Sequence, residues 1–252
     1  MNQTQLVERI NQKLAIDTVP DHYCPNGLQV EGDGRLVKKV ALAVSIGLEV
    51  IEQANHWGAE LLVTHHGLFW KHQSQTVTGP MAKKLKALLG TGLASASYHL
   101  PLDFHPELGN NIQLAKLLGL TEIRFLAPKG EINSMVMGRP AQSTIEALGA
   151  QIEALLGAKP LVLNFGPQKI ERLVICSGGA QSGFVPAIAL GAQAYLTGEA
   201  SEYVFGEAKE NGVHYLAAGH YKTERLGILA LGDWLAQEFK LDCRFFEVEN
   251  PI

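Results

Sequence analysis

The chain has 252 residues, of which 46% are hydrophobic and 18% charged, so it can bury a substantial core and is not expected to be disordered. Its net charge of −4 gives no electrostatic reason to expect binding to nucleic acid or to an anionic membrane. The three cysteines are far apart and form no CxxC pair, which argues against a thiolate zinc site. With no signal peptide and no run of ~18 apolar residues, we expect a cytoplasmic protein without membrane contact.

The first half of the chain alternates helical and strand patterns. Apolar residues at helical spacing predict an amphipathic helix at the start: Leu6, Ile10 and Leu14. Residues 38–66 then predict a strand, a helix closed by Gly58 and a second strand. A helix over residues 79–90 and a strand over residues 93–99 follow.

The second half repeats this order of elements. Residues 40–44 (VALAV) align with residues 173–177 (LVICS), and Gly58-Ala59 then falls on Gly191-Ala192. A helix over residues 201–212 and a strand over residues 213–220 continue the repeat. Two short apolar strands joined by a helix predict a βαβ unit with parallel strands in each half.

We therefore predict an α/β fold of two similar lobes, spanning residues 1–125 and 126–252. A stretch rich in proline and glycine separates the two halves, at residues 125–140. Ser143 and Glu146 then form a predicted capping box for a helix over residues 143–157. The lobe boundaries are soft, because the last helix and the last strand could pack on either lobe. These two elements are predicted at residues 223–239 and 242–249.

Imidazole and carboxylate groups collect where the predicted strands end. Open α/β sheets bind their ligands at these carboxyl ends, so we expect the groups to converge in a metal site in the cleft between facing lobes. The candidate metal ligands are His65, His66, Asp103, His220 and Glu224. Surface loops also produce isolated His-His and His-x-x-x-Asp patterns, so the prediction depends on their equivalent places in the repeat.

These ligand types suit Zn²⁺, Fe²⁺, Mn²⁺, Co²⁺ or Ni²⁺. Five ligands would suit two ions if one carboxylate bridges them, and Glu224 is the candidate bridge. Two ions can activate a water molecule and polarise the group that it attacks. His99 could then act as a base or contact a substrate, and Glu199 could act as an acid or base. Packing for His99 and a solvated helix start for Glu199 are the alternatives.

Glycines predict the backbone geometry of two segments, the one after the histidine pair and the one at residues 178–183. Neighbours in a strand point to opposite faces, so we expect the strand to end before His65 and His66, with Gly67 allowing a sharp turn. The segment GGAQSG (178–183) could hold an anion on its backbone N–H groups, but ordinary turn formation is the better interpretation because it lacks the full GxGxxG pattern.

Five motifs resemble those of the GTP cyclohydrolase I type 2 homologue family, also called Ngg-interacting-factor-three-like. They are PNGLQVEG (25–32), HHGLFW (65–70), HLPLDFHPELGNN (99–111), TGEASE (197–202) and AGHYKTE (218–224). The likeness covers essentially the whole chain and is greatest for the short bacterial members, which lack a central insert.

The resemblance implies two α/β lobes, a dinuclear metal site in their cleft and a toroidal homohexamer. It also implies that the five candidate ligands chosen above bind the metals. The family name implies opening of the GTP ring. We therefore expect a metal-dependent hydrolase of the cyclohydrolase type that acts on a purine nucleotide or a similar heterocycle. The alternative is a non-enzymatic protein that binds or delivers a metal ion.

Overall fold

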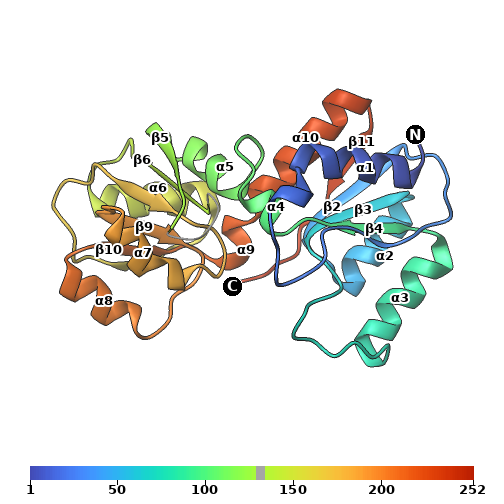
Figure 1. The fold of residues 1–252 in the computed structure, drawn as a ribbon, viewed down its shortest axis with the longest axis horizontal. Helices are drawn as coiled ribbons and strands as arrows, with labels where there is room; N and C mark the ends of the chain where they lie inside the picture. The colour runs from blue at the N-terminus through green and yellow to red at the C-terminus, as the bar shows by residue number, and fades with distance from the viewer. Residues whose placement is uncertain (129–133) are drawn as a thin grey trace. The chain divides into compact units, whose positions relative to one another are not determined.

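The computed structural model describes residues 1–128 and 134–252; residues 129–133, within the predicted connection at 125–140, lie outside the described residues. The chain divides into two compact units, each containing one β-sheet with helices (Figure 1). Unit 1 comprises residues 1–108 and 227–249, and unit 2 comprises residues 109–226 and 250–252. The predicted α/β class is confirmed.

The sheet of unit 1 has the order β1-β4-β3-β2-β11. Its strands are β1 (Gly27–Val30), β2 (Lys39–Ser45), β3 (Leu61–His66), β4 (Ala94–Ser97) and β11 (Asp242–Phe245). All neighbours are parallel except β1, which runs antiparallel to β4. The predicted βαβ unit is therefore present as β2, α2 and β3. The carboxyl ends of β2, β3 and β4 lie at one edge of the sheet, which places the side chains that follow them close together.

Helices cover the sheet of unit 1. They are α1 (Gln3–Leu14), α2 (Leu48–Trp57), α3 (Gly79–Thr91), α4 (Leu100–Asp103) and α10 (Arg225–Phe239), with a 3₁₀ turn at Ile16–Thr18. Val50, Ile51 and Leu88 from α2 and α3 are buried against apolar residues of β2 and β3. Helix α10 packs closely on β2, because a Cβ at Gly232 would overlap Leu42. Figure 1 shows α10 and β11 in red beside the blue elements of unit 1.

The sheet of unit 2 has the order β5-β6-β8-β9-β10-β7. Its strands are β5 (Thr121–Leu126), β6 (Met135–Arg139), β7 (Leu161–Leu163), β8 (Leu173–Ile175), β9 (Ala194–Thr197) and β10 (His214–Ala217). The parallel strands β10-β9-β8 repeat the arrangement of β4-β3-β2 in unit 1. The predicted internal repeat is thus present in the strand order of both sheets.

Two buried clusters cover the sheet of unit 2, one including Leu148 and Ile152 of α6 and the other including Phe184 of α7 and Val204 of α8. The helices are α5 (Asn110–Leu117), α6 (Ile145–Leu156), α7 (Phe184–Ala189), α8 (Val204–Asn211) and α9 (His220–Thr223), with a 3₁₀ turn at Gln181–Gly183. This packing fixes β9 and β10, whose ends carry the polar groups of unit 2.

Two predicted helix ends differ from the structure. The cap of α6 is Thr144 rather than Ser143, because the Thr144 hydroxyl accepts a hydrogen bond from the backbone of Ala147. Helix α3 continues through Gly90 and ends at Gly92, which has a positive φ of 69°. Left-handed geometry is easiest for glycine, so Gly92 is the better helix terminator.

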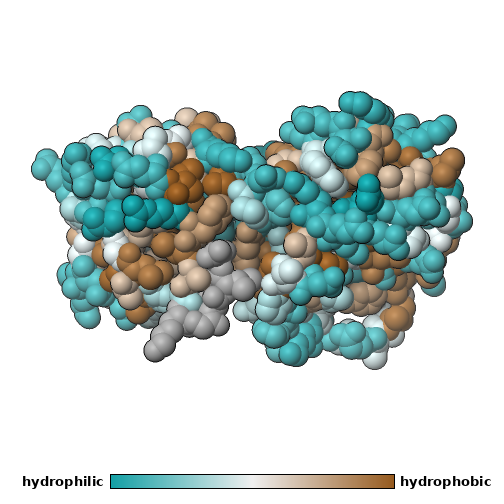
Figure 2. Space-filling view, turned by 45° about the horizontal axis from the view of Figure 1, so that its top comes forward, coloured by the Kyte–Doolittle hydropathy of each residue, from teal (hydrophilic) through white to brown (hydrophobic). Residues whose placement is uncertain are grey.

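The face drawn in Figure 2 is largely hydrophilic, with apolar residues in patches. Within residues 1–128 and 134–252, no helix combines the length and the apolar character that crossing a membrane requires.

Candidate metal-binding residues

The histidine pair of unit 1 lies inside β3. The strand runs through His66, which pairs with Ser45 of β2, so the expectation that the strand ends before the pair is wrong. Pairing continues because β2 extends equally far. His65 is fully buried and His66 partly buried, yet their ring centroids are only 4.6 Å apart, with the rings tilted by 39°. Both imidazoles therefore remain close together at the carboxyl end of the strand.

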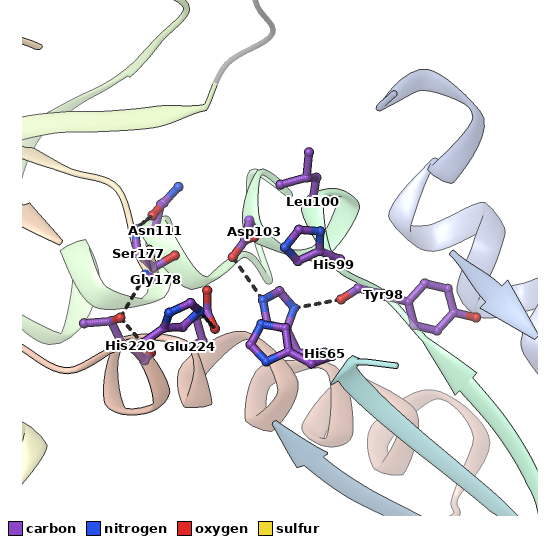
Figure 3. Close-up of polar contacts among 12 residues, drawn as sticks. His65, Tyr98, His99, Leu100, Asp103, Asn111, Ser177, Gly178, His220 and Glu224 are labelled. Carbon is purple, nitrogen blue, oxygen red and sulfur yellow. Dashed lines mark hydrogen bonds and ion pairs between the residues drawn. The ribbon is translucent and has the colours of Figure 1, made fainter. Parts of the chain in front are cut away.

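His65 lies between a carbonyl and a carboxylate. Its Nδ1 is 2.8 Å from the Tyr98 carbonyl oxygen and its Nε2 is 3.6 Å from Oδ1 of Asp103 (Figure 3). A carbonyl only accepts, so Nδ1 carries the proton of this hydrogen bond. In neutral His65, Nε2 then presents a lone pair toward the Asp103 carboxylate. Two acceptors that face each other are stabilised by a proton or a cation between them.

His66 is also oriented through its Nδ1 atom. This nitrogen lies 2.9 Å from the Ser45 hydroxyl, and the His66 carbonyl accepts a hydrogen bond from the backbone of Ile46. A contact at Nδ1 leaves Nε2 as the nitrogen that can meet a ligand. Metal-binding histidines typically have one ring nitrogen held by an oxygen in this way.

Gly67 lets the Ser97 and Gln29 side chains approach the backbone closely, and it does not form a sharp turn. Its φ is outside the left-handed region, contrary to the predicted role. A Cβ there would instead overlap the Ser97 hydroxyl and the side-chain amide of Gln29. The same amide accepts a hydrogen bond from the backbone of Leu68 at 2.7 Å. The absence of a side chain at Gly67 therefore lets β1, β3 and β4 close around the histidine pair.

His99 and Asp103 come from the two ends of the short helix α4, directly after β4. Figure 3 shows both side chains beside His65. His99 is held by Asp21, whose Oδ2 lies 3.0 Å from His99 Nδ1. One ring nitrogen from each of His65, His66 and His99 lies within 4.8 Å of the other two, so these three residues form a group that could hold a metal ion. Unit 1 thus brings together all four residues predicted from its strand ends.

His220 in unit 2 lies between two carboxylates. Its Nδ1 is 2.6 Å from Oε1 of Glu199 and its Nε2 is 3.1 Å from Oε2 of Glu224. Burial alone would lower the pKa of His220, but hydrogen bonds and charge from Glu224 and Glu199 outweigh it and raise the pKa to about 9. His220 Nε2 and the Glu224 carboxylate are both donor groups that could bind a metal cation in place of this proton.

The glycine segment 178–183 forms a turn next to this group. Gly178 has a positive φ of 68°, and its N–H donates to the Thr223 hydroxyl at 3.0 Å. Its carbonyl accepts from the Gly198 N–H and the Thr197 hydroxyl. A Cβ at Gly178 would overlap the Glu224 carboxylate. Because these backbone groups are used within the protein, the turn interpretation fits better than the anion site.

Several contacts of these residues were not predicted from the sequence: Asp21, Ser45 and the Tyr98 carbonyl. Asp21 precedes the PNG motif by only a few residues, but its link to His99 spans 78 positions of the chain. The sequence signal for a role of Asp21 is its position just before the Pro-Asn-Gly segment. The contacts show how each imidazole is oriented by oxygen atoms at Nδ1.

The donor set fits divalent metal ions in both units. Neutral imidazole nitrogens and carboxylate oxygens suit Zn²⁺ and the neighbouring first-row ions, and the oriented Nδ1 atoms are typical of such ligands. The fold and these donors define an α/β protein in which unit 1 carries His65, His66, His99 and Asp103 and unit 2 carries His220, Glu199 and Glu224. Each group could take part in holding a divalent ion.

The chain belongs to the Duf34/NIF3 (NGG1p interacting factor 3) family, whose model matches residues 1–251. Proteins named GTP cyclohydrolase 1 type 2 homolog from Haemophilus influenzae and Escherichia coli are 42% and 43% identical to it, with 100% of both chains covered in each case. These matches confirm the family resemblance seen in the motifs.

Solved structures show the same fold over the whole chain. Protein ybgI, whose function is described as unknown, gives a TM-score of 0.94 at 40% identity and covers 100% of both chains. Reduced HcgD from Methanocaldococcus jannaschii gives a TM-score of 0.84 at 25% identity and covers 98% of both chains.

Proposed function

We propose that this chain is a divalent-metal-binding protein that holds two ions. The ligands are His65, His66, Asp103, His220 and Glu224. The observation that carries the proposal is the shared orientation of the three histidines. Each has its Nδ1 within 2.9 Å of an oxygen atom, from Tyr98, Ser45 or Glu199. This arrangement presents three Nε2 atoms to ligands, and carboxylates lie beside two of them.

We further propose that the protein is a metal-dependent hydrolase of the GTP cyclohydrolase type, acting on a purine nucleotide or a similar heterocycle. The names of its full-length relatives support this class of substrate. Bound ions would supply an activated water and polarise the attacked carbon. His99, beside the histidine pair, is placed to move a proton at Nε2 because Asp21 occupies its Nδ1.

Glu199 is a proposed proton-transfer residue with a second role. Its Oε1 atom holds His220 at 2.6 Å, so it fixes the orientation of this imidazole. A carboxylate engaged in this way keeps Nε2 of His220 directed toward Glu224. Loss of Glu199 would therefore affect metal binding as well as any acid–base step.

Metal analysis tests the binding proposal. Protein purified without added metal and then dialysed against Zn²⁺ should bind two ions per chain, and His66→Ala should reduce this stoichiometry. His72→Ala is the matched control, because His72 is exposed and outside the candidate groups. Absence of specific Zn²⁺, Fe²⁺, Mn²⁺, Co²⁺ and Ni²⁺ binding would contradict the proposal.

Incubation of the metal-loaded protein with GTP tests the reaction. The expected products are formate and a fluorescent pterin, both absent with His66→Ala. If the protein binds metal but converts neither GTP nor related heterocycles, the non-enzymatic alternative is supported. Transfer of the ion to an acceptor apo-protein then tests metal delivery. The homohexamer stays a prediction, which light scattering of the purified protein would test.

A further inference from the structure

Unit 1 contains a pocket that none of the roles described so far uses. Its volume is about 540 Å³, and sites for small molecules typically have about 300–1,000 Å³. Two segments form it: residues 21–25 before β1, and Phe69, Trp70, Lys71 and Gln75 after β3. All of these residues belong to unit 1, so the pocket is complete within one compact part of the chain.

The indole of Trp70 is a wall that the pocket shares with the histidine group. Its ring centroid lies 5.6 Å from that of His66 and 5.2 Å from that of His99. On the other segment, the ring of Tyr23 lies 5.7 Å from His99. A molecule that packs against Trp70 in this pocket would therefore lie next to His99, the proposed proton-transfer residue.

The aromatic walls are held in place by the protein itself. The Nε1–H of Trp70 donates to the Gly67 carbonyl at 3.1 Å, and an indole has no other donor, so Trp70 offers the pocket only apolar ring surface. Phe69 packs against the buried cluster of unit 1. The backbone N–H of Lys71 donates to the Tyr23 carbonyl at 2.7 Å, which ties the two segments together. These contacts form the pocket without a ligand.

Tyr23 is the aromatic residue whose place internal packing does not explain. Its backbone is fixed, because its N–H donates to Oδ1 of Asp21 at 2.9 Å. Its side chain is nevertheless 52% exposed. A second ring packed against Tyr23 would remove apolar surface from water, which stabilises a complex. Tyr23 and Trp70 together suit a planar aromatic ligand.

The charges around the pocket favour an anionic group on that ligand. Among the described residues that line it, Asp21 is the one carboxylate and Lys71 the one lysine. The Asp21 side chain is only 2% exposed, and its Oδ2 accepts from Asn26 and His99. Lys71 is exposed and supplies an accessible ammonium group. The pocket thus combines an apolar aromatic wall with a cation.

We infer that this pocket binds the purine base of a nucleotide against Trp70 and Tyr23, with the phosphate groups toward Lys71. Purine rings are planar and stack on tryptophan and tyrosine, and a lysine ammonium binds phosphate as a point charge. The inference rests on the proposed function and gives the nucleotide a place beside His99. It makes Trp70 and Tyr23 substrate-binding residues.

Titration calorimetry of the metal-free full chain with GTP and with guanosine tests the pocket separately from metal binding and turnover. Trp70→Ala should weaken the binding of both ligands by about 5- to 100-fold, and Trp70→Phe should restore most of the affinity because a ring remains. Tyr23→Ala, at an exposed position that does not support the core, should also weaken both. Phe205→Ala is the matched control, because Phe205 is likewise 52% exposed but does not line the pocket.

Lys71→Ala tests the position of the phosphate groups. It should weaken GTP binding by about 3-fold and leave guanosine binding unchanged, and the difference should disappear at high salt, which screens exposed charges. Lys83→Ala is the matched control, because Lys83 is an exposed lysine of α3 outside the pocket. An equal loss of affinity for GTP and guanosine in Lys71→Ala would overturn this placement of the phosphates.

Two results would overturn the inference as a whole. They are unchanged affinity for both ligands in Trp70→Ala and Tyr23→Ala, and no binding of either ligand by the unsubstituted chain. Neither result bears on metal binding. GTP binding that depends on Trp70, without turnover by the metal-loaded protein, would instead contradict the proposed reaction and support the pocket.

Discussion

The Oε1 atom of Glu199 lies 2.6 Å from Nδ1 of His220. Glu199 follows β9 and His220 follows β10, and these two strands are parallel neighbours. The contact therefore arises directly from the sheet, whose adjacent carboxyl ends bring the two residues together. It gives unit 2 an imidazole with one nitrogen held by a carboxylate and the other directed toward Glu224.

Replacing this carboxylate should weaken metal binding. In Glu199→Gln the amide oxygen can still accept from His220 Nδ1, but the negative charge is lost. We expect about 10-fold weaker Zn²⁺ binding by chelator competition, the lower end of the range for residues that orient a ligand. Glu202→Gln is the matched control, because Glu202 is an exposed carboxylate of the same segment. Equal affinities for the two variants would contradict the orienting role.

Metal binding should become tighter as pH rises toward about 9. The pKa of His220 is raised to about 9 from an ordinary 6.5, so a proton occupies the imidazole throughout neutral pH and must leave when an ion binds. The affinity should increase by roughly tenfold per pH unit between pH 7 and 9 and level off above, as measured by titration calorimetry. Glu199→Gln should move the plateau to lower pH.

The same group affects the metal-free protein. A raised folded-state pKa means that protonated His220 stabilises the fold fully below the unfolded pKa of about 6.5 and that this contribution is lost as pH rises through about 9. Urea unfolding of metal-free protein should therefore show a decrease in stability over this interval. A flat profile from pH 6.5 to 9.5 would contradict the assignment.

Gly67→Ala should destabilise unit 1. The added methyl group would meet the Ser97 hydroxyl and the Gln29 amide in a buried region, and overpacking of this kind costs about 1–3 kcal/mol of unfolding free energy. Gly90→Ala is the matched control, because Gly90 is in α3 with open space around it. It should instead stabilise the protein by about 0.5–1 kcal/mol. Urea unfolding of both variants makes the comparison.

Tyr98→Phe should separate stability from metal binding. The Tyr98 hydroxyl donates to Asn11 Oδ1 at 2.8 Å, and its loss would leave a part-buried acceptor without this donor at a cost of about 1–3 kcal/mol. His65 is held by the backbone carbonyl of Tyr98, which the substitution keeps. We expect lower urea stability with unchanged Zn²⁺ affinity. A fall in affinity equal to that of His66→Ala would show that the side chain also orients the site.

The elements around the candidate ligands could be predicted because their signals are local. Apolar runs ending in polar residues mark β3 and β10, and the repeated strand-helix-strand order predicts parallel neighbours. Parallel neighbours have their carboxyl ends at one edge, so His65, Asp103, His220 and Glu224 could be chosen from their positions along the chain.

The orienting contacts could not be predicted in the same way. Asp21 and His99 are 78 residues apart, and nothing in either local pattern indicates their pairing. The local pattern also does not predict the end of β3, because the length of this strand depends on the pairing of His66 with Ser45 of β2. Strand β6 is only five residues long and contains Gly138, so it did not stand out within the stretch rich in proline and glycine.

Strand β11, the last strand of the chain, pairs with β2 in the sheet of unit 1. During synthesis β2 therefore has an open edge until residues 242–245 leave the ribosome, whereas almost all of unit 2 has already been made. Open strand edges promote association between chains. The earliest part of the protein thus completes its sheet last, and a nascent chain that ends before β11 leaves this edge of β2 unpaired.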